Sequence, residues 1–177
     1  MEKKLALDTA ALERSYHQLS RKLHPDRFAS SGVRVRDASL RATALLTRSY
    51  RTLRDPVSRG RYWLELNGEK LGENNKSVPP DLAEMVFDVQ EQLTELRTAG
   101  QAVKPALLDQ LSERRAALQS SIDSAHEELR RNFQRWDSNS GEKKPLIAEL
   151  KSILSKIAYL RTLVRDVDRE LENARAA

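Results

Sequence analysis

Residues 12–28 read LERSYHQLSRKLHPDRF, and this stretch decides how the N-terminal part of the chain folds. Its apolar residues recur at three- and four-residue steps, which places them on one inward-facing side of a helix. They are Leu12, Tyr16, Leu19 and Leu23. Asp8 is a suitable N-cap because its carboxylate can accept hydrogen bonds from free backbone N–H groups. Pro25 ends the helix, because it lacks an N–H and disfavours helical backbone at His24.

Two more helical segments follow in the N-terminal part. After a polar stretch from Asp26 to Arg36 comes a second pattern of apolar residues, namely Ala42, Leu45, Leu46, Tyr50 and Leu53. Asp55 and Pro56 open a third helix with a cap and a proline at its first position, and Gly68 can end it. We therefore predict two longer helices joined by a loop, plus a short third one.

A segment rich in Gly, Asn, Ser and Pro, NGEKLGENNKSVPP at residues 67–80, separates this part from the rest. We predict a first domain at residues 1–70, a linker at 71–80 and a second domain at 81–177. The second domain has three amphipathic segments, which begin at Pro79-Pro80, Pro105 and about Pro145. Their core positions are Leu82, Met85, Val86, Val89, Leu93 and Leu96; then Leu111, Leu118, Ile122, Ala125, Leu129, Phe133 and Trp136; then Ile147, Leu150, Leu154, Ile157, Val164, Val167 and Leu171.

Three such helices with short connections pack most simply as an up-down-up antiparallel bundle. No two-residue alternation indicates strands, so we predict an all-α protein.

Composition excludes several classes of function. Without cysteine the chain has no disulfide, thiol nucleophile or thiolate metal site, and three histidines are few for a transition metal, so we expect no metal and no cofactor. It has no P-loop, no glycine-rich dinucleotide turn and no HExxH, and we predict that it is not an enzyme. No run of about 18 apolar residues and no signal-peptide pattern occurs, so we expect a cytoplasmic protein without a membrane partner.

The positive charge is local. Residues 1–68 hold 14 Lys and Arg against 7 Asp and Glu, a net charge of +7, whereas residues 69–177 hold 17 against 19, a net of −2. Halves of opposite sign favour two modules with different partners over one continuous surface for a polyanion. A basic helical protein that binds nucleic acid through the first module stays open as an alternative, although aromatic residues are sparse among its arginines.

A basic amphipathic helix followed by His24-Pro25-Asp26 and a second helix resembles a J domain. Two blocks, LDTAALERSYHQLSRKLHPDRFAS and TRSYRTLRDPVSRGRYWLELNG, are followed by a linker and an acidic helical half. Together they resemble the HscB-type co-chaperones of iron–sulfur cluster assembly over nearly the whole chain. The resemblance implies a J domain that stimulates the ATPase of an HscA/DnaK-type heat-shock chaperone, and a C-terminal three-helix bundle that binds the IscU-type scaffold.

The resemblance makes His24, Pro25 and Asp26 the motif that stimulates the ATPase. If the apolar stripe of the first helix faces inward, a polar set faces outward beside that motif. With Arg27, which follows the motif, the expected chaperone-binding residues on that side are Arg14, His17, Gln18, Arg21 and Lys22. A basic face suits an acidic patch on a chaperone, and the alternative is a solvated charged face.

In the second domain, Phe87 lies about 150° from the centre of the apolar stripe of its helix, so it should point into water. Its neighbours on that outer face are Glu84, Asp88, Glu91 and Glu95. An exposed aromatic ringed by carboxylates is typical of a binding anchor, although single exposed apolar residues are also common. Tyr159 on the last helix lies about 140° from the centre of its stripe, with Leu163 beside it.

The scaffold-binding surface of the family, which uses acidic and apolar positions on the first bundle helix and an aromatic on the last, maps by this resemblance onto the same set. We therefore expect the scaffold to bind residues Phe87, Asp88, Glu84, Glu91, Glu95, Tyr159 and Leu163. Where the family usually has a Leu-Met pair, this chain has Ala83 and Glu84, which leaves a J-domain adaptor for a different client as an alternative.

Overall fold

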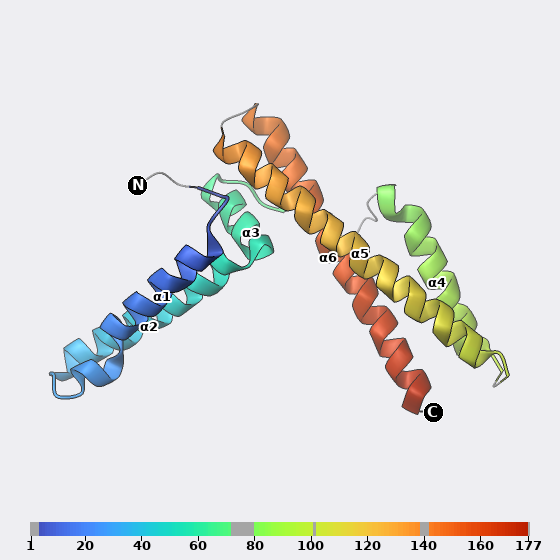
Figure 1. Cartoon of the computed structure of the whole chain (residues 1–177), viewed down its shortest axis with the longest axis horizontal. Coiled ribbons are helices and arrows are strands. Elements are labelled where there is room, and N and C mark those ends of the chain that lie inside the picture. The colour runs from blue at the N-terminus through green and yellow to red at the C-terminus, as the bar shows by residue number, and fades with distance from the viewer. Residues whose placement is uncertain (1–3, 72–79, 101, 139–141, 177) are drawn as a thin grey trace. The chain divides into compact units, whose positions relative to one another are not determined.

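A computed structural model describes residues 4–71, 80–100, 102–138 and 142–176, and these residues contain helices and turns but no strand (Figure 1). The α-helices of the described residues are α1 (Thr9–Leu23), α2 (Val33–Arg54), α3 (Pro56–Leu66), α4 (Ala83–Thr98), α5 (Lys104–Asp137) and α6 (Lys143–Ala176). Short 3₁₀ turns, η1 (Pro25–Phe28) and η2 (Pro80–Leu82), precede α2 and α4. The all-α prediction is confirmed.

The chain divides into two compact units. Unit 1 consists of Met1–Lys70 together with Phe133–Gly141, and unit 2 consists of Leu71–Asn132 together with Glu142–Ala177. The last turn of α5 therefore packs with the N-terminal residues. Residues 72–79 of the expected linker, including Pro79, lie outside the described residues.

Local chemistry sets the limits of the unit 1 helices, as predicted. The Asp8 side chain accepts hydrogen bonds from the N–H groups of residues 10 and 11, at 2.9 and 3.1 Å. Asp55 caps α3 by accepting from the Ser58 N–H at 2.7 Å, with Pro56 in the first turn. Gly68, at a φ of 72°, ends α3 in a left-handed conformation that glycine adopts without a steric penalty.

The three helices of unit 2 form the predicted up-down-up bundle. Arg115 of α5 pairs with Asp168 of α6, and His126 of α5 lies 3.4 Å from Arg161, so higher numbers on α5 meet lower numbers on α6 and the two helices are antiparallel. On α4 and α6 the numbers rise together, because Asp81, just before α4, pairs with Lys156 and Arg97 pairs with Glu170. α4 and α6 are therefore parallel.

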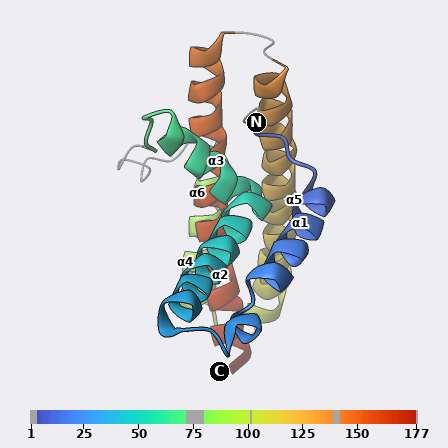
Figure 2. The same cartoon turned by 90° about the vertical axis from the view of Figure 1, so that its left-hand side faces the viewer.

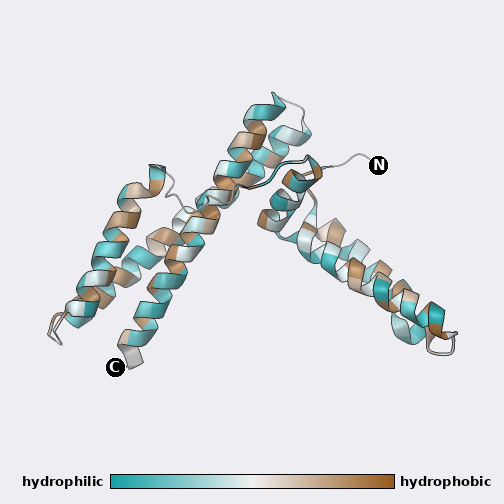
Figure 3. Ribbon diagram, turned by 180° about the vertical axis from the view of Figure 1, so that it is seen from behind, coloured by the Kyte–Doolittle hydropathy of each residue, from teal (hydrophilic) through white to brown (hydrophobic). Residues whose placement is uncertain are grey.

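One apolar core joins the three helices of unit 2. Hydrophobic and hydrophilic bands alternate along each long helix (Figure 3), and hydrophobic residues from all three helices form the shared core. Its buried residues are Leu82, Val89, Leu93 and Leu96 near and on α4; Leu111, Leu118 and Ile122 on α5; and Leu160, Leu163, Val167 and Leu171 on α6. Burial of this apolar area is the main force that holds the bundle together. None of the described helices combines the length and apolarity needed to cross a bilayer.

Unit 1 has much thinner packing. α1 and α2 lie side by side as a hairpin joined by η1 (Figure 2), yet α1 fully buries none of its residues and α2 buries only Ser39. Tyr16 and Tyr50 stack across the hairpin with ring centroids 4.2 Å apart. The expectation that Leu19 and Leu45 face inward is wrong, since Leu45 is 67% exposed and Leu19 also faces water. A two-helix hairpin covers only a narrow stripe of each helix, so apolar residues at its edges stay exposed.

Candidate functional site

The turn between α1 and α2 brings His24, Pro25 and Asp26 to the surface of unit 1. His24 leaves the helical conformation with a ψ of 130°, and Pro25 opens η1. The His24 Nδ1 accepts a hydrogen bond from the Asp26 N–H at 3.3 Å and lies 3.4 Å from the Asp26 carboxylate. An unprotonated Nδ1 makes the first contact and a protonated one the second. Either way the ring is held on its Nδ1 side, and in the described part of the chain its Nε2 makes no hydrogen bond.

Two hydroxyl groups of α2 hold the end of α1, just before this turn, by hydrogen bonds. Ser39 Oγ donates to the Leu23 carbonyl at 2.6 Å, and Thr43 Oγ1 donates to the same oxygen at 3.0 Å. The carbonyls at the end of a helix have no partner within it, so these bonds satisfy the last turn of α1. They also fix the position of His24, which follows directly. Sequence reasoning missed this pair, whose signal is two hydroxyl residues four apart on the face of α2 that meets α1.

Removing both hydroxyls should loosen the turn. For Ser39→Ala combined with Thr43→Val, we expect the free energy of unfolding to fall by about 1–3 kcal/mol, because a partly buried carbonyl loses its donors. Urea denaturation followed by circular dichroism measures this change. Ser15→Ala is the matched control, since the Ser15 hydroxyl donates a hydrogen bond to the Ala11 carbonyl within the exposed part of α1 and, within the described residues, to no other group. An equal loss in the control would contradict the anchoring role.

The polar face of α1 is exposed beside the turn, as the helical spacing predicts. The side chains expected to bind the chaperone, apart from the half-buried Pro25, are exposed: Arg14, His17, Gln18, Arg21, Lys22, His24, Asp26 and Arg27. Arg14 makes only a 4.0 Å contact with Asp8, and among the described residues Arg21, Lys22 and Arg27 form no ion pair. The face therefore presents several positive charges that no neighbouring carboxylate neutralises.

A second cluster in unit 1 joins the N-terminal segment and α3 to the end of α5. The Asp137 carboxylate accepts hydrogen bonds from the Leu5 N–H at 2.8 Å and the Ala6 N–H at 2.7 Å, and Leu5 is completely buried. The Arg59 guanidinium, on a side chain only 7% exposed, lies 5.3 Å from the centre of the Phe133 ring. Burial lowers the pKa of Arg59, and the carboxylates of Asp55 and Asp137 oppose that shift. Asp137 therefore accepts hydrogen bonds from the backbone and also stabilises the charge of the buried Arg59.

This cluster also changes the environment expected for two aromatic residues. Phe133 and Trp136 are on the predicted core stripe of the second domain, but the structure packs both in unit 1. Trp136 is half-buried and meets Trp63 of α3 edge to face, with centroids 5.6 Å apart. Periodicity marks which face of a helix is covered, and it cannot tell which segment covers it.

The outer face of α4 presents the expected aromatic in an acidic field. Phe87 is 68% exposed, and Glu84, Glu91 and Glu95 are exposed around it, which confirms its predicted orientation. Asp88 is partly withdrawn from this face, because its carboxylate pairs with Arg114 of α5 at 3.2 Å.

Ion pairs between α4 and α6 show where Tyr159 lies relative to Phe87. The Lys156–Asp81 pair (3.0 Å) and the Arg97–Glu170 pair (2.6 Å) set a register of about 74 residues between these parallel helices. Tyr159 is thus level with residues 84–86 of α4, less than one turn from Phe87. Lys156 and Glu170 also mark the side of α6 that faces α4, and Tyr159 lies on that side. It is half-buried and packs against the core cluster.

Leu163 does not share this surface. Its side chain is 2% exposed and belongs to the core of unit 2, so its expected place beside Tyr159 on an exposed face is wrong. α6 contacts both α4 and α5, and its buried face is consequently wider than the single stripe read from the sequence. The neighbouring Val164, which the sequence pattern places in the core, is only half-buried.

The described residues contain no group of three or more His, Asp or Glu placed to hold a metal ion. The arrangement they do present is two exposed polar surfaces, one on each unit.

Comparison with known proteins identifies the family. No protein-family model matches the chain. It is 33% identical over 117 residues to the co-chaperone protein HscB homolog of Burkholderia multivorans, which covers 64% of this chain and 67% of that protein. Chaperone HscB from Vibrio cholerae has a similar structure, with a TM-score of 0.64 and 20% identity over 94% of this chain and 90% of that one.

Human co-chaperone protein HscB matches with the same TM-score of 0.64 and 22% identity, over 94% of this chain and 76% of that one. These two likenesses show the fold, a J domain followed by a C-terminal helical domain. The sequence identity to the Burkholderia protein shows more than the fold, and the chain belongs to the HscB family of co-chaperones.

Proposed function

We propose that this chain stimulates ATP hydrolysis by an HscA/DnaK-type chaperone in the cytoplasm and delivers an IscU-type scaffold to it during iron–sulfur cluster assembly. HscB co-chaperones are not enzymes, so the chaperone hydrolyses the ATP. The observation that best supports the proposal is the pair of separate exposed surfaces, one basic and beside the His24 turn, the other acidic and centred on Phe87. We assign residues 1–70 to chaperone binding, residues 71–80 to a linker and residues 81–177 to scaffold binding.

The chaperone contact would combine a rigid turn with a positive face. His24, Pro25 and Asp26 lie at the end of α1, which the Leu23 carbonyl ties to α2. The neighbouring cations Arg21, Lys22 and Arg27 are exposed and attract an acidic partner. Such charges mainly accelerate encounter and set orientation, so binding should weaken as salt is added.

The scaffold contact would be centred on Phe87. An exposed aromatic ring leaves a large hydrophobic area in contact with water. A partner that covers this area gains the favourable free energy of burying it. Glu84, Glu91 and Glu95 form a polar rim that selects a basic partner. Tyr159, level with the same turn of α4, extends the apolar part of the surface.

Two surfaces on one chain allow bivalent delivery. When one partner is bound, the other binds in an effectively intramolecular step, at an effective concentration that the link between the surfaces sets. The chaperone would then receive the scaffold while the J domain favours ATP hydrolysis, which tightens the chaperone's grip and eases cluster release.

Scaffold binding tests this assignment. We expect Phe87→Ala to weaken binding of a purified IscU-type scaffold by about 10–100-fold, as for removal of a central aromatic anchor, and Tyr159→Ala to weaken it less because that ring is half-buried. Isothermal titration calorimetry measures both changes. Val103→Ala is the matched control, because Val103 is an exposed apolar residue outside this surface.

Unchanged affinity for Phe87→Ala would contradict the assigned surface. A chain that stimulates the chaperone ATPase but does not bind the scaffold would indicate a different client.

A further inference from the structure

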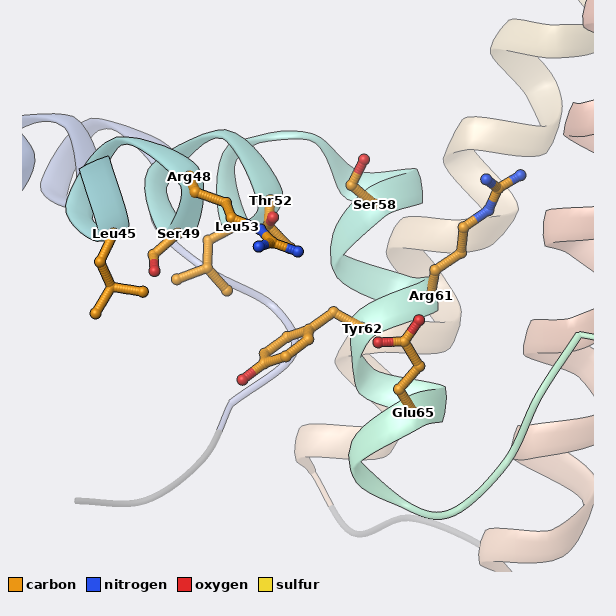
Figure 4. Close-up of a pocket in the computed structure, with 9 residues that line it drawn as sticks. All are labelled: Leu45, Arg48, Ser49, Thr52, Leu53, Ser58, Arg61, Tyr62 and Glu65. Carbon is orange, nitrogen blue, oxygen red and sulfur yellow. The ribbon is translucent and has the colours of Figure 1, made fainter. Parts of the chain in front are cut away.

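A groove between α2 and α3 presents apolar residues to water on unit 1. It encloses about 530 Å³ and is lined by Leu45, Leu53 and Tyr62, with Arg48 and Arg61 beside them (Figure 4). Leu45 and Tyr62 point into the corner between the two helices, and both are exposed. The groove lies away from the His24 turn, and the proposed function does not use it.

The face of α2 that lines this groove continues beyond it to Arg41, and its charges are opposite in sign to those on the outer face of α4. On α2, Arg41, Leu45 and Arg48 follow one another at steps of four and three residues, so they lie on one face. On α4, the outer face holds an acidic residue, an aromatic residue and a second acidic residue at steps of three and four residues. These are Glu84, Phe87 and Glu91.

We propose that α4 of one copy of this chain docks antiparallel along α2 of a second copy, with Phe87 in the groove. In that orientation the steps match: Phe87 lies over Leu45, Glu84 meets Arg48, and Glu91 meets Arg41. Tyr62 on the α3 wall covers the Phe87 ring from the other side. The occupant of the groove is thus a surface of the same protein.

Exposure and charge both support this pairing. All six paired residues are exposed, and within the described residues none of the four charged ones makes an ion pair, so no existing contact has to break. The positive net charge of the N-terminal half and the negative net charge of the rest favour contact between unlike halves of two copies. A single aromatic anchor between two exposed ion pairs gives a weak, reversible association that salt suppresses. If Phe87 also binds the scaffold, scaffold and self-association compete, although the pairing itself does not depend on scaffold binding.

Sedimentation equilibrium of the full chain, from about 1 µM to about 0.5 mM, tests the proposal. At low salt the average mass should rise above the 20.2 kDa of one chain as concentration increases, and it should return toward that value at about 0.5 M salt. Leu45→Glu and Phe87→Ala should each leave a monomer across the range. Arg48→Glu should weaken association about tenfold, and adding Glu84→Arg to it should restore association because the pair is reversed.

Leu40→Glu is the matched control for Leu45→Glu, since Leu40 is also exposed on α2 but lies about 140° away around the helix. It should associate like the unaltered chain. A mass of 20.2 kDa at every concentration, persistent association of Leu45→Glu, or no restoration by Glu84→Arg would each overturn the proposal.

Discussion

Replacing His24 with Gln is expected to abolish stimulation of the chaperone ATPase while leaving the fold intact. The imidazole is held on its Nδ1 side by the Asp26 N–H, so it offers its Nε2 side in a fixed orientation. Glutamine has no ring and more rotatable bonds, and it cannot reproduce that orientation. We expect the stimulated rate to fall at least about tenfold, equivalent to about 1.4 kcal/mol of lost coupling. Steady-state ATPase assays with the purified chaperone measure it.

The control for this change is His17→Gln, an exposed histidine on the polar face of α1. In the described part of the chain its only polar side-chain contact is with Glu13, at 3.9 Å, and it should retain most of the stimulation. Urea denaturation of His24→Gln should match that of the unaltered chain, because more than half of the His24 side chain is exposed. Full stimulation by His24→Gln, or equal loss in the two variants, would contradict the role of the turn.

Replacing Asp137 with Ala is expected to destabilise unit 1 severely. The carboxylate accepts hydrogen bonds from the backbone of Leu5 and Ala6, and it compensates the buried Arg59 guanidinium, whose Nε and Nη1 make no hydrogen bond with the described residues. Its removal leaves these backbone donors without their acceptor and Arg59 with the Asp55 carboxylate alone to oppose its burial, which should lower the free energy of unfolding by about 2–4 kcal/mol. Chemical denaturation followed by tryptophan fluorescence is suited to this test, since Trp63 and Trp136 lie in the same unit.

Asp123→Ala provides the control on the same helix. Asp123 is exposed and, among the described residues, accepts a hydrogen bond only from the Gln119 side chain, so its loss should change stability by less than about 0.5 kcal/mol. Asp137→Asn separates charge from hydrogen bonding, because its amide oxygen can still accept from the backbone. We expect its stability to fall between those of Asp137→Ala and the unaltered chain. An Asp137→Ala variant as stable as Asp123→Ala would show that the cluster contributes little.

The helix limits were predictable because local chemistry decides them. Asp8, Asp55 and Gly68 act on backbone groups within a few residues of themselves, so their roles can be read from the sequence alone. The structure differs slightly for the two long helices. Pro105 is the second residue of α5 and Pro145 the third residue of α6, whereas the sequence pattern predicts that each helix begins at its proline. The N–H groups of a first helical turn need no intrahelical acceptor, so a proline is tolerated throughout that turn.

Burial was predictable only where one helix face meets one neighbour. Phe87, opposite the stripe of α4, is exposed as expected. Leu163 is buried because α6 has two neighbours in the bundle. Leu45 is exposed because the hairpin covers only a small part of the surface of α2. Contacts between distant segments could not be foreseen either. The Asp137 bonds join residues more than 130 positions apart, and nothing in local sequence pattern specifies such a pairing.

The central claim, bivalent delivery, makes a direct kinetic prediction. The ATPase rate of the chaperone should be measured alone, with the scaffold, with this chain, and with both. If the chain holds the scaffold while its J domain meets the chaperone, the two together should raise the rate by more than the sum of their separate effects. A rate with both that equals this sum, or no stimulation by the chain in either mixture, would contradict the account.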